Sequence, residues 1–315
     1  MIESLYRREE KVEYILETKN IKKKYSHFNA LNKLNMHIPK GAIYGLIGKN
    51  GAGKTTLIRI ICGLQKATSG EYSIYGIASN SKKIVDVRKK IGGIVETPAI
   101  CLDMTAEDNL KEQYKIIGLP SYDNLEEILK LVRLNDTGSK KAKHFSLGMK
   151  QRLGIAIALV GNPDLLILDE PINGLDPEGI IEIRELILRL NKEKGITFLI
   201  SSHYLDELSK IATFYGIIDK GAIIEEIDKN ELEQKFRKRI QIKVTNLVEC
   251  VKYLEEKKYS YKVLSDNIIE IYEKLNASEF FIELSKRNCT VSDYQEKGES
   301  LENYYLNLIG GANND

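Results

Sequence analysis

The chain has 315 residues, which is enough for two domains with buried cores. Hydrophobic residues make up 43% of it and charged residues 29%, as in ordinary globular proteins. With 47 basic and 45 acidic residues the net charge is +2, so the composition gives no sign of an extended nucleic-acid-binding surface and no nucleic acid partner is expected.

The N-terminal stretch is strongly charged. It begins "MIESLYRREEKVEYILE", which is too polar for a secretory signal, and we expect residues 1–14 to form a charged extension. No later stretch approaches the roughly 18 to 20 apolar residues of a membrane-spanning helix, so no direct membrane span is predicted. The four cysteines lie far apart in the sequence, which favours free thiols.

Residues 15–228 alternate short apolar runs with segments of helical periodicity. The pattern predicts strands at 42–47, 165–170, 196–202 and 215–221, and helices at 53–64, 147–160 and 177–195. Such an alternation is typical of an α/β domain built on a parallel or mixed sheet. Residues 103–160 are mostly helical in pattern, which predicts a helical subdomain inserted into the sheet domain.

Residues 236–315 have a different texture. The pattern predicts a strand at 239–244, a helix at 246–258, a hairpin over 261–272, a helix at 278–288, a strand at 290–294 and a closing helix at 300–311. This order is compatible with a small α+β accessory domain of the ferredoxin-like type. No residue in it suggests catalysis.

The segment "GKNGAGKTT" meets the pattern of a phosphate-binding loop between a strand and a helix. Its glycines let backbone N–H groups converge on phosphates, and the following helix N-terminus adds a positive dipole. Lys54 would reach the β- and γ-phosphates of ATP, and the Thr55 hydroxyl would bind Mg²⁺. The loop predicts contacts to ATP from Gly48, Lys49, Asn50, Gly51, Ala52, Gly53, Lys54, Thr55 and Thr56.

The run "LLILDE" ends a predicted buried strand with two carboxylates. Parallel sheets bind ligands at the carboxyl ends of their strands, so these side chains would lie beside the phosphate loop. Asp169 would hold Mg²⁺, directly or through water. Glu170 would activate the attacking water for transfer of a phosphoryl group. Together with the loop, the pair predicts an enzyme that hydrolyses ATP.

The ordered set of motifs over residues 15–228 resembles the nucleotide-binding domain of ABC (ATP-binding cassette) proteins. "KKYSHFNAL" supplies Tyr25 where the family stacks adenine, and "FSLGMKQR" stands at the signature motif with Ser146 and Gly148. "NGLDP" matches the D-loop through Asp176, and "SSHYLDE" the switch histidine, His203. The resemblance implies a homodimer in the ATP-bound state, in which the partner's signature completes each site, with His203 in a catalytic role.

Two positions depart from the common pattern of the family. The signature reads Phe145-Ser146-Leu147-Gly148-Met149 in place of L-S-G-G-Q, and "GGIVETP" carries Glu96 where most members have a glutamine that coordinates Mg²⁺. A carboxylate can still ligate Mg²⁺ but cannot donate the hydrogen bonds of an amide. We expect nucleotide binding to be retained and turnover or coupling to change.

The glutamate, the altered signature and the closing segment "LENYYLNLIGG" resemble a narrower group, the ATPases of bacitracin-resistance and lantibiotic-immunity transporters. This resemblance implies a motor subunit that works on a separate transmembrane permease from the cytoplasmic face of the membrane and exports a peptide antibiotic. Two alternatives remain open. One is a motor for export of a lipid or small drug, and the other is a soluble ABC ATPase that acts on ribosomes or DNA.

Overall fold

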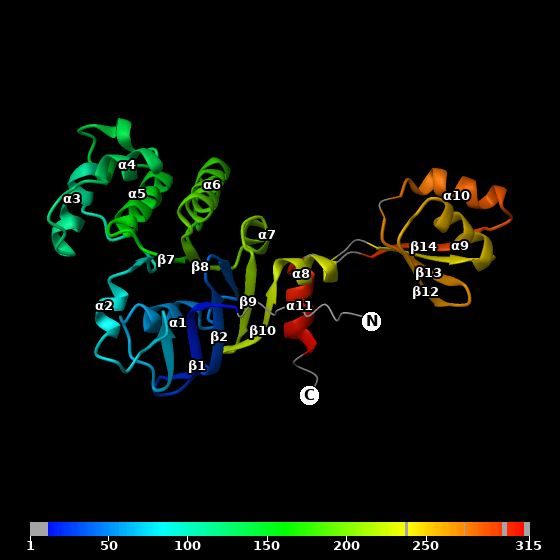
Figure 1. The fold of residues 1–315 in the computed structure, drawn as a ribbon, viewed down its shortest axis with the longest axis horizontal. Helices are drawn as coiled ribbons and strands as arrows, with labels where there is room; N and C mark the ends of the chain where they lie inside the picture. Colours follow the sequence, from blue (N-terminus) through cyan, green and yellow to red (C-terminus); the bar gives the residue numbers. More distant parts are fainter. Residues whose placement is uncertain (1–11, 237–238, 274, 298–300, 312–315) are drawn as a thin grey trace, which may run out of the picture. The chain divides into compact units, whose positions relative to one another are not determined.

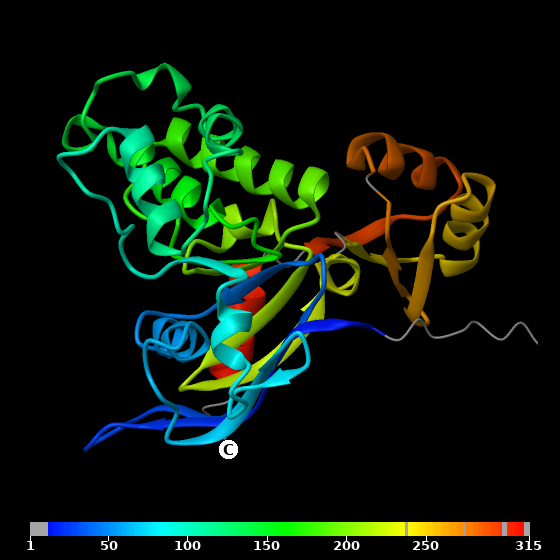
Figure 2. The ribbon, with the colours of Figure 1, turned by 60° about the vertical axis from the view of Figure 1, so that its left-hand side comes forward.

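The computed structural model describes residues 12–236, 239–273, 275–297 and 301–311. It divides into two compact units, residues 1–229 and 230–315, which Figures 1 and 2 show as ribbons. The predicted N-terminal extension lies outside the described residues, apart from residues 12–14 at its end. Each unit is described by itself below.

The first unit contains a six-stranded sheet in the order β10-β9-β3-β8-β7-β6. The five strands β9, β3, β8, β7 and β6 run parallel to one another. Strand β10 pairs antiparallel with β9 at one edge. Every residue of β3, β7 and β8 is buried, which confirms the α/β prediction made from their continuous apolar runs. The strands are β3 (Ile43–Ile47), β6 (Ile91–Ile94), β7 (Leu165–Asp169), β8 (Thr197–Ser202), β9 (Phe214–Asp219) and β10 (Ala222–Asp228).

A second, antiparallel sheet in the same unit was not predicted. It has the order β2-β1-β4-β5, formed by β1 (Tyr14–Lys24), β2 (Asn29–Pro39), β4 (Ser69–Ile74) and β5 (Ile77–Ala78). Helix α1 (Lys54–Ile61) contacts β2 and β7, and its buried face shares one hydrophobic core with strands of both sheets. This core fixes the start of α1 next to the loop that follows β3.

Helices cover the rest of the first unit. The segment predicted as a helical subdomain contains α3 (Ala106–Ile116), α4 (Leu125–Leu131) and α5 (Leu147–Leu159), which pack on one another and lie together in Figure 1. The remaining helices of this unit are α2 (Ile84–Arg88), α6 (Pro177–Lys194) and α7 (Leu205–Ser209), and α8 (Lys229–Phe236) begins at its last residue and continues in the second unit. In the described part of the chain, no helix is both long and apolar enough to cross a membrane.

The second unit is a four-stranded antiparallel sheet with helices. The sheet order is β12-β13-β11-β14, and the order along the chain is β-α-β-β-α-β followed by a final helix. Its core includes Ile242, Leu254 and Phe280. The elements are β11 (Arg239–Val244), α9 (Leu247–Glu256), β12 (Tyr261–Ser265), β13 (Ile268–Ile271), α10 (Ala277–Lys286), β14 (Val291–Lys297) and α11 (Leu301–Gly311).

The four cysteines are free thiols in contrasting surroundings. Cys101 is exposed, whereas Cys250 and Cys289 are fully buried in the core of the second unit. Burial raises the pKa of the Cys62 thiol to about 12, and burial together with the neighbouring Cys289 raises the pKa of Cys250 to about 12 as well. Of these thiols, Cys101 is exposed and Cys62 is partly exposed.

Candidate active site

The parallel strands bring four loops to one edge of the six-stranded sheet. The phosphate loop follows β3, His203 follows β8, Glu170 follows β7 and Glu96 follows β6 by two residues. These strands are neighbours in the order β3-β8-β7-β6, and parallel strands all end at the same edge. Segments separated by more than a hundred residues in sequence therefore meet there.

The phosphate loop is held in a tight conformation by its glycines. Gly53 has a φ of +113°, and a Cβ added to it would lie 2.7 Å from the carbonyl oxygen of Ala30. A Cβ on Gly48 would lie 2.6 Å from the carbonyl oxygen of Ile218. Both positions thus need glycine, one for its backbone angle and both for space. The loop leads directly into α1, which begins at Lys54.

Lys54 and Glu170 form the charged centre of the site. Lys54 is 5% exposed, and its Nζ donates to the carbonyl oxygen of Gly48 at 2.6 Å. The same Nζ lies 3.3 Å from Oε1 of Glu170. The other carboxylate oxygen of Glu170 lies 2.8 Å from Nδ1 of His203. The ammonium group is therefore inside the phosphate loop, with a carboxylate and an imidazole on one side.

The backbone at Glu170 is also unusual. Its φ of +50° lies in the left-handed region, which non-glycine residues rarely adopt. Its N–H donates to Oγ of Ser201 at 3.0 Å and to the carbonyl oxygen of the same residue at 3.2 Å. Ser201, at 0% exposure on β8, thereby fixes the position from which the Glu170 side chain departs.

Asp169 is buried behind this centre, at 3% exposure, and accepts a hydrogen bond from the Ser201 hydroxyl. Its carboxylate and the hydroxyl of Thr55 are the hard oxygen donors that Mg²⁺ prefers. Among the residues that the structure describes, no three His, Cys, Asp or Glu side chains converge to hold a metal ion. This donor set suits a Mg²⁺ ion that takes most of its ligands from phosphates and water.

A cavity of about 310 Å³ opens at this edge of the sheet. It is lined by most of the phosphate loop, by Glu170 and by His203, and Thr55 and Thr56 both face it. Gly48 and Ala52 do not line the cavity, and the Ala52 carbonyl accepts from the N–H of Gly221 in the turn between β9 and β10. The predicted residues that line the cavity are Lys49, Asn50, Gly51, Gly53, Lys54, Thr55, Thr56, Glu170 and His203.

Three lining residues were missed by the sequence analysis: Phe28, Ala30 and Asn173. Phe28 stands three positions after Tyr25, so its aromatic side chain was a visible signal beside a motif already recognised. Tyr25 stacks on Phe28 with ring centroids 5.2 Å apart, but Phe28 is the aromatic residue of this pair that lines the cavity. Asn173 carried no signal of its own.

Glu96 takes part in an ion pair that the sequence did not reveal. Its Oε1 lies 2.7 Å from Nη2 of Arg59 on α1, and both side chains are partly exposed. The pair raises the pKa of the Arg59 guanidinium, mainly through the hydrogen bond to Glu96. Glu96 itself has a φ of +64°, a further left-handed residue in this region.

The signature and D-loop residues lie outside the lining of this cavity. Ser146 caps the start of α5 by accepting from the N–H of Met149 at 3.2 Å, and Asp176 caps α6 by accepting from Gly179 at 3.0 Å. A Cβ on Gly148 would lie 3.9 Å from Cα of Gly179. The structure thus brings Ser146, Gly148 and Asp176 together with each other, at the adjacent starts of α5 and α6.

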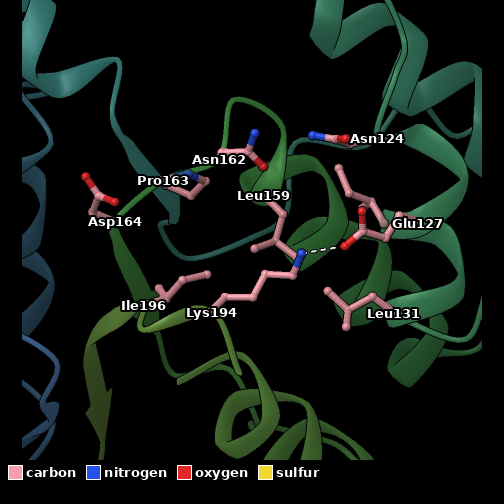
Figure 3. A pocket seen from close by; sticks show the side chains of 10 residues that line it. Asn124, Glu127, Leu131, Leu159, Asn162, Pro163, Asp164, Lys194 and Ile196 are labelled. Atoms are coloured by element: carbon pink, nitrogen blue, oxygen red, sulfur yellow. Dashed lines mark hydrogen bonds and ion pairs between the residues drawn. The ribbon is translucent and has the colours of Figure 1, made fainter. Parts of the chain in front are cut away.

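A second cavity, of about 350 Å³, lies at the other end of the same strands (Figure 3). Asp164 and Ile196 line it and directly precede β7 and β8, whereas Asp169 ends β7. Lys194 at the end of α6 forms an ion pair with Glu127 of α4 beside it, drawn as a dashed line in Figure 3. No predicted site residue within the described chain lines this cavity, so it is separate from the phosphate loop.

Comparison with known proteins gives consistent matches. A family model described as ABC transporter matches residues 31–173. The bacitracin transport ATP-binding protein BcrA of Enterococcus faecalis is 39% identical over 306 residues, covering 96% of this chain and 98% of that protein. BcrA of Bacillus licheniformis is 41% identical over 308 residues, covering 95% and 98%.

The lantibiotic transport ATP-binding protein SrtF of Streptococcus pyogenes is 44% identical over 229 residues, which cover 72% of this chain and 97% of that protein. Among solved structures, a dimeric ATP-binding cassette in a post-hydrolysis state with ADP and Pi matches with a TM-score of 0.62 at 26% identity. That match covers 68% of this chain and 98% of the other.

Proposed function

The chain belongs to the ABC transporter family of ATP-binding proteins and is an ATPase, and from this premise we propose that it drives removal of a peptide antibiotic from the cell. It is the motor subunit, and it works on a separate transmembrane permease at the inner face of the membrane. The observation that carries the proposal is the similarity to two bacitracin transport proteins over 95% and 96% of the chain. The transported peptide is bacitracin or a lantibiotic.

The share of this chain that each relative covers indicates which antibiotic to test first. The match to SrtF spans 229 residues, whereas the two units together span residues 1–315, so that match cannot contain both units in full. The match to SrtF covers 72% of this chain, whereas the matches to the two BcrA proteins cover 95% and 96% and so extend over both units. This difference supports bacitracin as the first antibiotic to test and lantibiotics as the second.

ATP hydrolysis proceeds on the edge of the sheet described above. The backbone of the phosphate loop binds the phosphates, and Lys54 neutralises the β- and γ-phosphates. Glu170 orients the attacking water and accepts its proton, and His203 holds the Glu170 carboxylate through Nδ1 at 2.8 Å. Thr55, Asp169 and Glu96 would hold Mg²⁺, which when bound neutralises phosphate charge.

The complete site requires two copies of the chain. Ser146 and Gly148 lie at the N-terminus of the 13-residue helix α5, whose positive end can face a phosphate, but they do not line the cavity around their own phosphate loop. In an ATP-bound homodimer the signature of one copy faces the phosphates held by the other. The similar solved cassette, which is a dimer bound to ADP and Pi, supports this arrangement.

Deletion of the gene tests the cargo. We expect the deletion strain to become more sensitive to bacitracin or to a lantibiotic, with resistance restored by the wild-type gene but not by Glu170→Gln. Unchanged sensitivity across a panel of both classes would contradict peptide export and leave export of a lipid or small drug. Recovery of ribosomes in place of a polytopic membrane protein in a pulldown from membranes would contradict the transporter role altogether.

A further inference from the structure

The loop after β6 is bonded to the short segment that precedes α5. The N–H of Ala142 donates to the carbonyl oxygen of Met104 at 2.9 Å, and the N–H of Lys143 donates to the carbonyl oxygen of Leu102 at 2.8 Å. Nζ of Lys143 also lies 2.8 Å from Oδ1 of Asp103. Backbone hydrogen bonds and an ion pair therefore hold the two segments together.

Asn109 of α3 holds the same loop from the other side. Its side chain is buried, at 4% exposure. Its Oδ1 accepts from the N–H of Cys101 at 2.8 Å, and its Nδ2 donates to the carbonyl oxygens of Cys101 at 3.1 Å and of Thr105 at 2.8 Å. An amide is the short side-chain group that can donate twice and accept as well, so these partners explain why asparagine stands here.

Residues 101–104, which we call the bridge segment, are thus held between α3 and the segment before the signature. Glu96 lies five residues before the bridge segment, and Ser146 lies three residues after Lys143. In the proposed site of two copies, Glu96 would serve the ATP on its own chain, whereas Ser146 faces the phosphates on the other. The bridge segment therefore connects a group of one ATP site with a group of the second.

We propose that Asn109 is a positioning residue for ATP hydrolysis, which acts by holding the bridge segment. Asn109 does not line the cavity around the phosphate loop, so it acts through Glu96 and the signature rather than on the nucleotide. The inference rests on the proposed site of two copies and adds the residue that keeps its parts in place. Loss of a group that orients the residues around a ligand lowers activity by about 10- to 100-fold.

Replacing Asn109 by leucine tests the inference. Leucine has a similar shape but makes none of these hydrogen bonds, so the N–H and carbonyl of Cys101 lose their side-chain partner. At saturating ATP and Mg²⁺, Asn109→Leu should lower kcat by about 10- to 100-fold, while the dissociation constant for ADP stays within about threefold of wild type because the phosphate loop is unchanged. Asn109→Ser removes the same contacts with a smaller side chain, and it should lower kcat in the same direction where the leucine variant does not fold.

Asn191→Leu is the matched control. Nδ2 of Asn191 also donates to backbone carbonyl oxygens, those of Gly41 and Ile196, each at 2.8 Å. These residues precede β3 and β8, so they lie at the edge of the sheet opposite the phosphate loop. The control loses contacts of the same kind and should keep kcat within about twofold of wild type, whereas an equal loss of kcat in both leucine variants would overturn the inference.

Hydrogen exchange at the amides of Ala142 and Lys143 reports on the bridge segment directly. Both amides donate to it, so their exchange should be at least about tenfold faster in Asn109→Leu and unchanged in Asn191→Leu. Faster exchange with kcat within twofold of wild type would make Asn109 only structural and overturn the inference, as would unchanged exchange in the folded variant. A wild-type chain that hydrolyses no ATP, or forms no dimer in ATP, contradicts the proposed site of two copies instead, so the two failures are distinguishable.

Discussion

Replacing Glu170 by glutamine separates the chemical step from nucleotide binding. Glutamine has the same shape, so its oxygen can still accept from Nζ of Lys54, which lies 3.3 Å from Glu170 Oε1. Its amide nitrogen takes the place of the oxygen that lies 2.8 Å from Nδ1 of His203. The fold and the cavity should therefore be retained, while the group that accepts a proton from water is lost.

The expected loss follows from the role of a general base. Such a group contributes about 10²- to 10⁴-fold to a rate, which equals about 2.7 to 5.4 kcal/mol of barrier. Removing a negative charge next to the triphosphate also favours ATP binding, so the dissociation constant for ATP should stay the same or fall. Unhydrolysed ATP should then hold two copies together as a closed dimer.

Phosphate release by the purified chain measures the rate, and size-exclusion chromatography in ATP measures the dimer. Glu71→Gln is the matched control, because Glu71 is an exposed carboxylate on β4, in the other sheet of the same unit. The control should hydrolyse ATP at the wild-type rate. A Glu170→Gln variant that hydrolyses ATP within tenfold of wild type would refute the assignment of Glu170 as the base.

Three further predictions concern neighbouring groups. Ser201→Ala leaves the buried Asp169 carboxylate without its hydroxyl donor and should cost about 1 to 3 kcal/mol, lowering the first thermal transition of the chain by roughly 2 to 12 °C; a shift below 1 °C would contradict this. Glu96→Gln should change the ATPase rate while the affinity for ADP stays within threefold of wild type, and its effect on the rate should be smaller in an Arg59→Ala background. An equal effect on the rate with and without Arg59 would argue against the ion pair as the cause of the change. At pH 8 a thiol reagent should label Cys101 first in the native chain, Cys62 more slowly because its pKa is raised, and all four cysteines after unfolding. Fast labelling of Cys250 or Cys289 in the native chain would contradict the burial described above.

Four of the six strands of the sheet that carries the site were predicted, and β3, β7 and β8 gave the clearest signal because they are apolar on both faces, whereas β6 and β10 were not predicted. The other sheet was not, although β1 and β2 are each 11 residues long. Their pairing shifts register at several points, including between Thr18 and Ile21, so the apolar residues do not alternate with a steady period of two. Bulges therefore hid two long strands that a regular alternation would have indicated.

Within the site too, some features could be predicted from the sequence and others could not. The phosphate loop was predictable because nine adjacent residues specify its conformation and its contacts. The Arg59–Glu96 ion pair joins residues 37 positions apart, and neither residue's local sequence indicates the other. The same applies to Ser201, which supports both Asp169 and Glu170 from a neighbouring strand. Contacts between strands depend on sheet order, which a local pattern does not specify.

The two departures from the usual cassette pattern, Glu96 and the altered signature, are mechanically connected. Glu96 begins a loop whose Pro98 packs on α5, where a Cβ added to Gly154 would lie 2.5 Å from Cβ of Pro98. Helix α5 begins directly after Ser146, so the loop that follows β6 is in direct contact with the signature helix. A displacement of this loop would therefore press on α5 through the contact between Pro98 and Gly154.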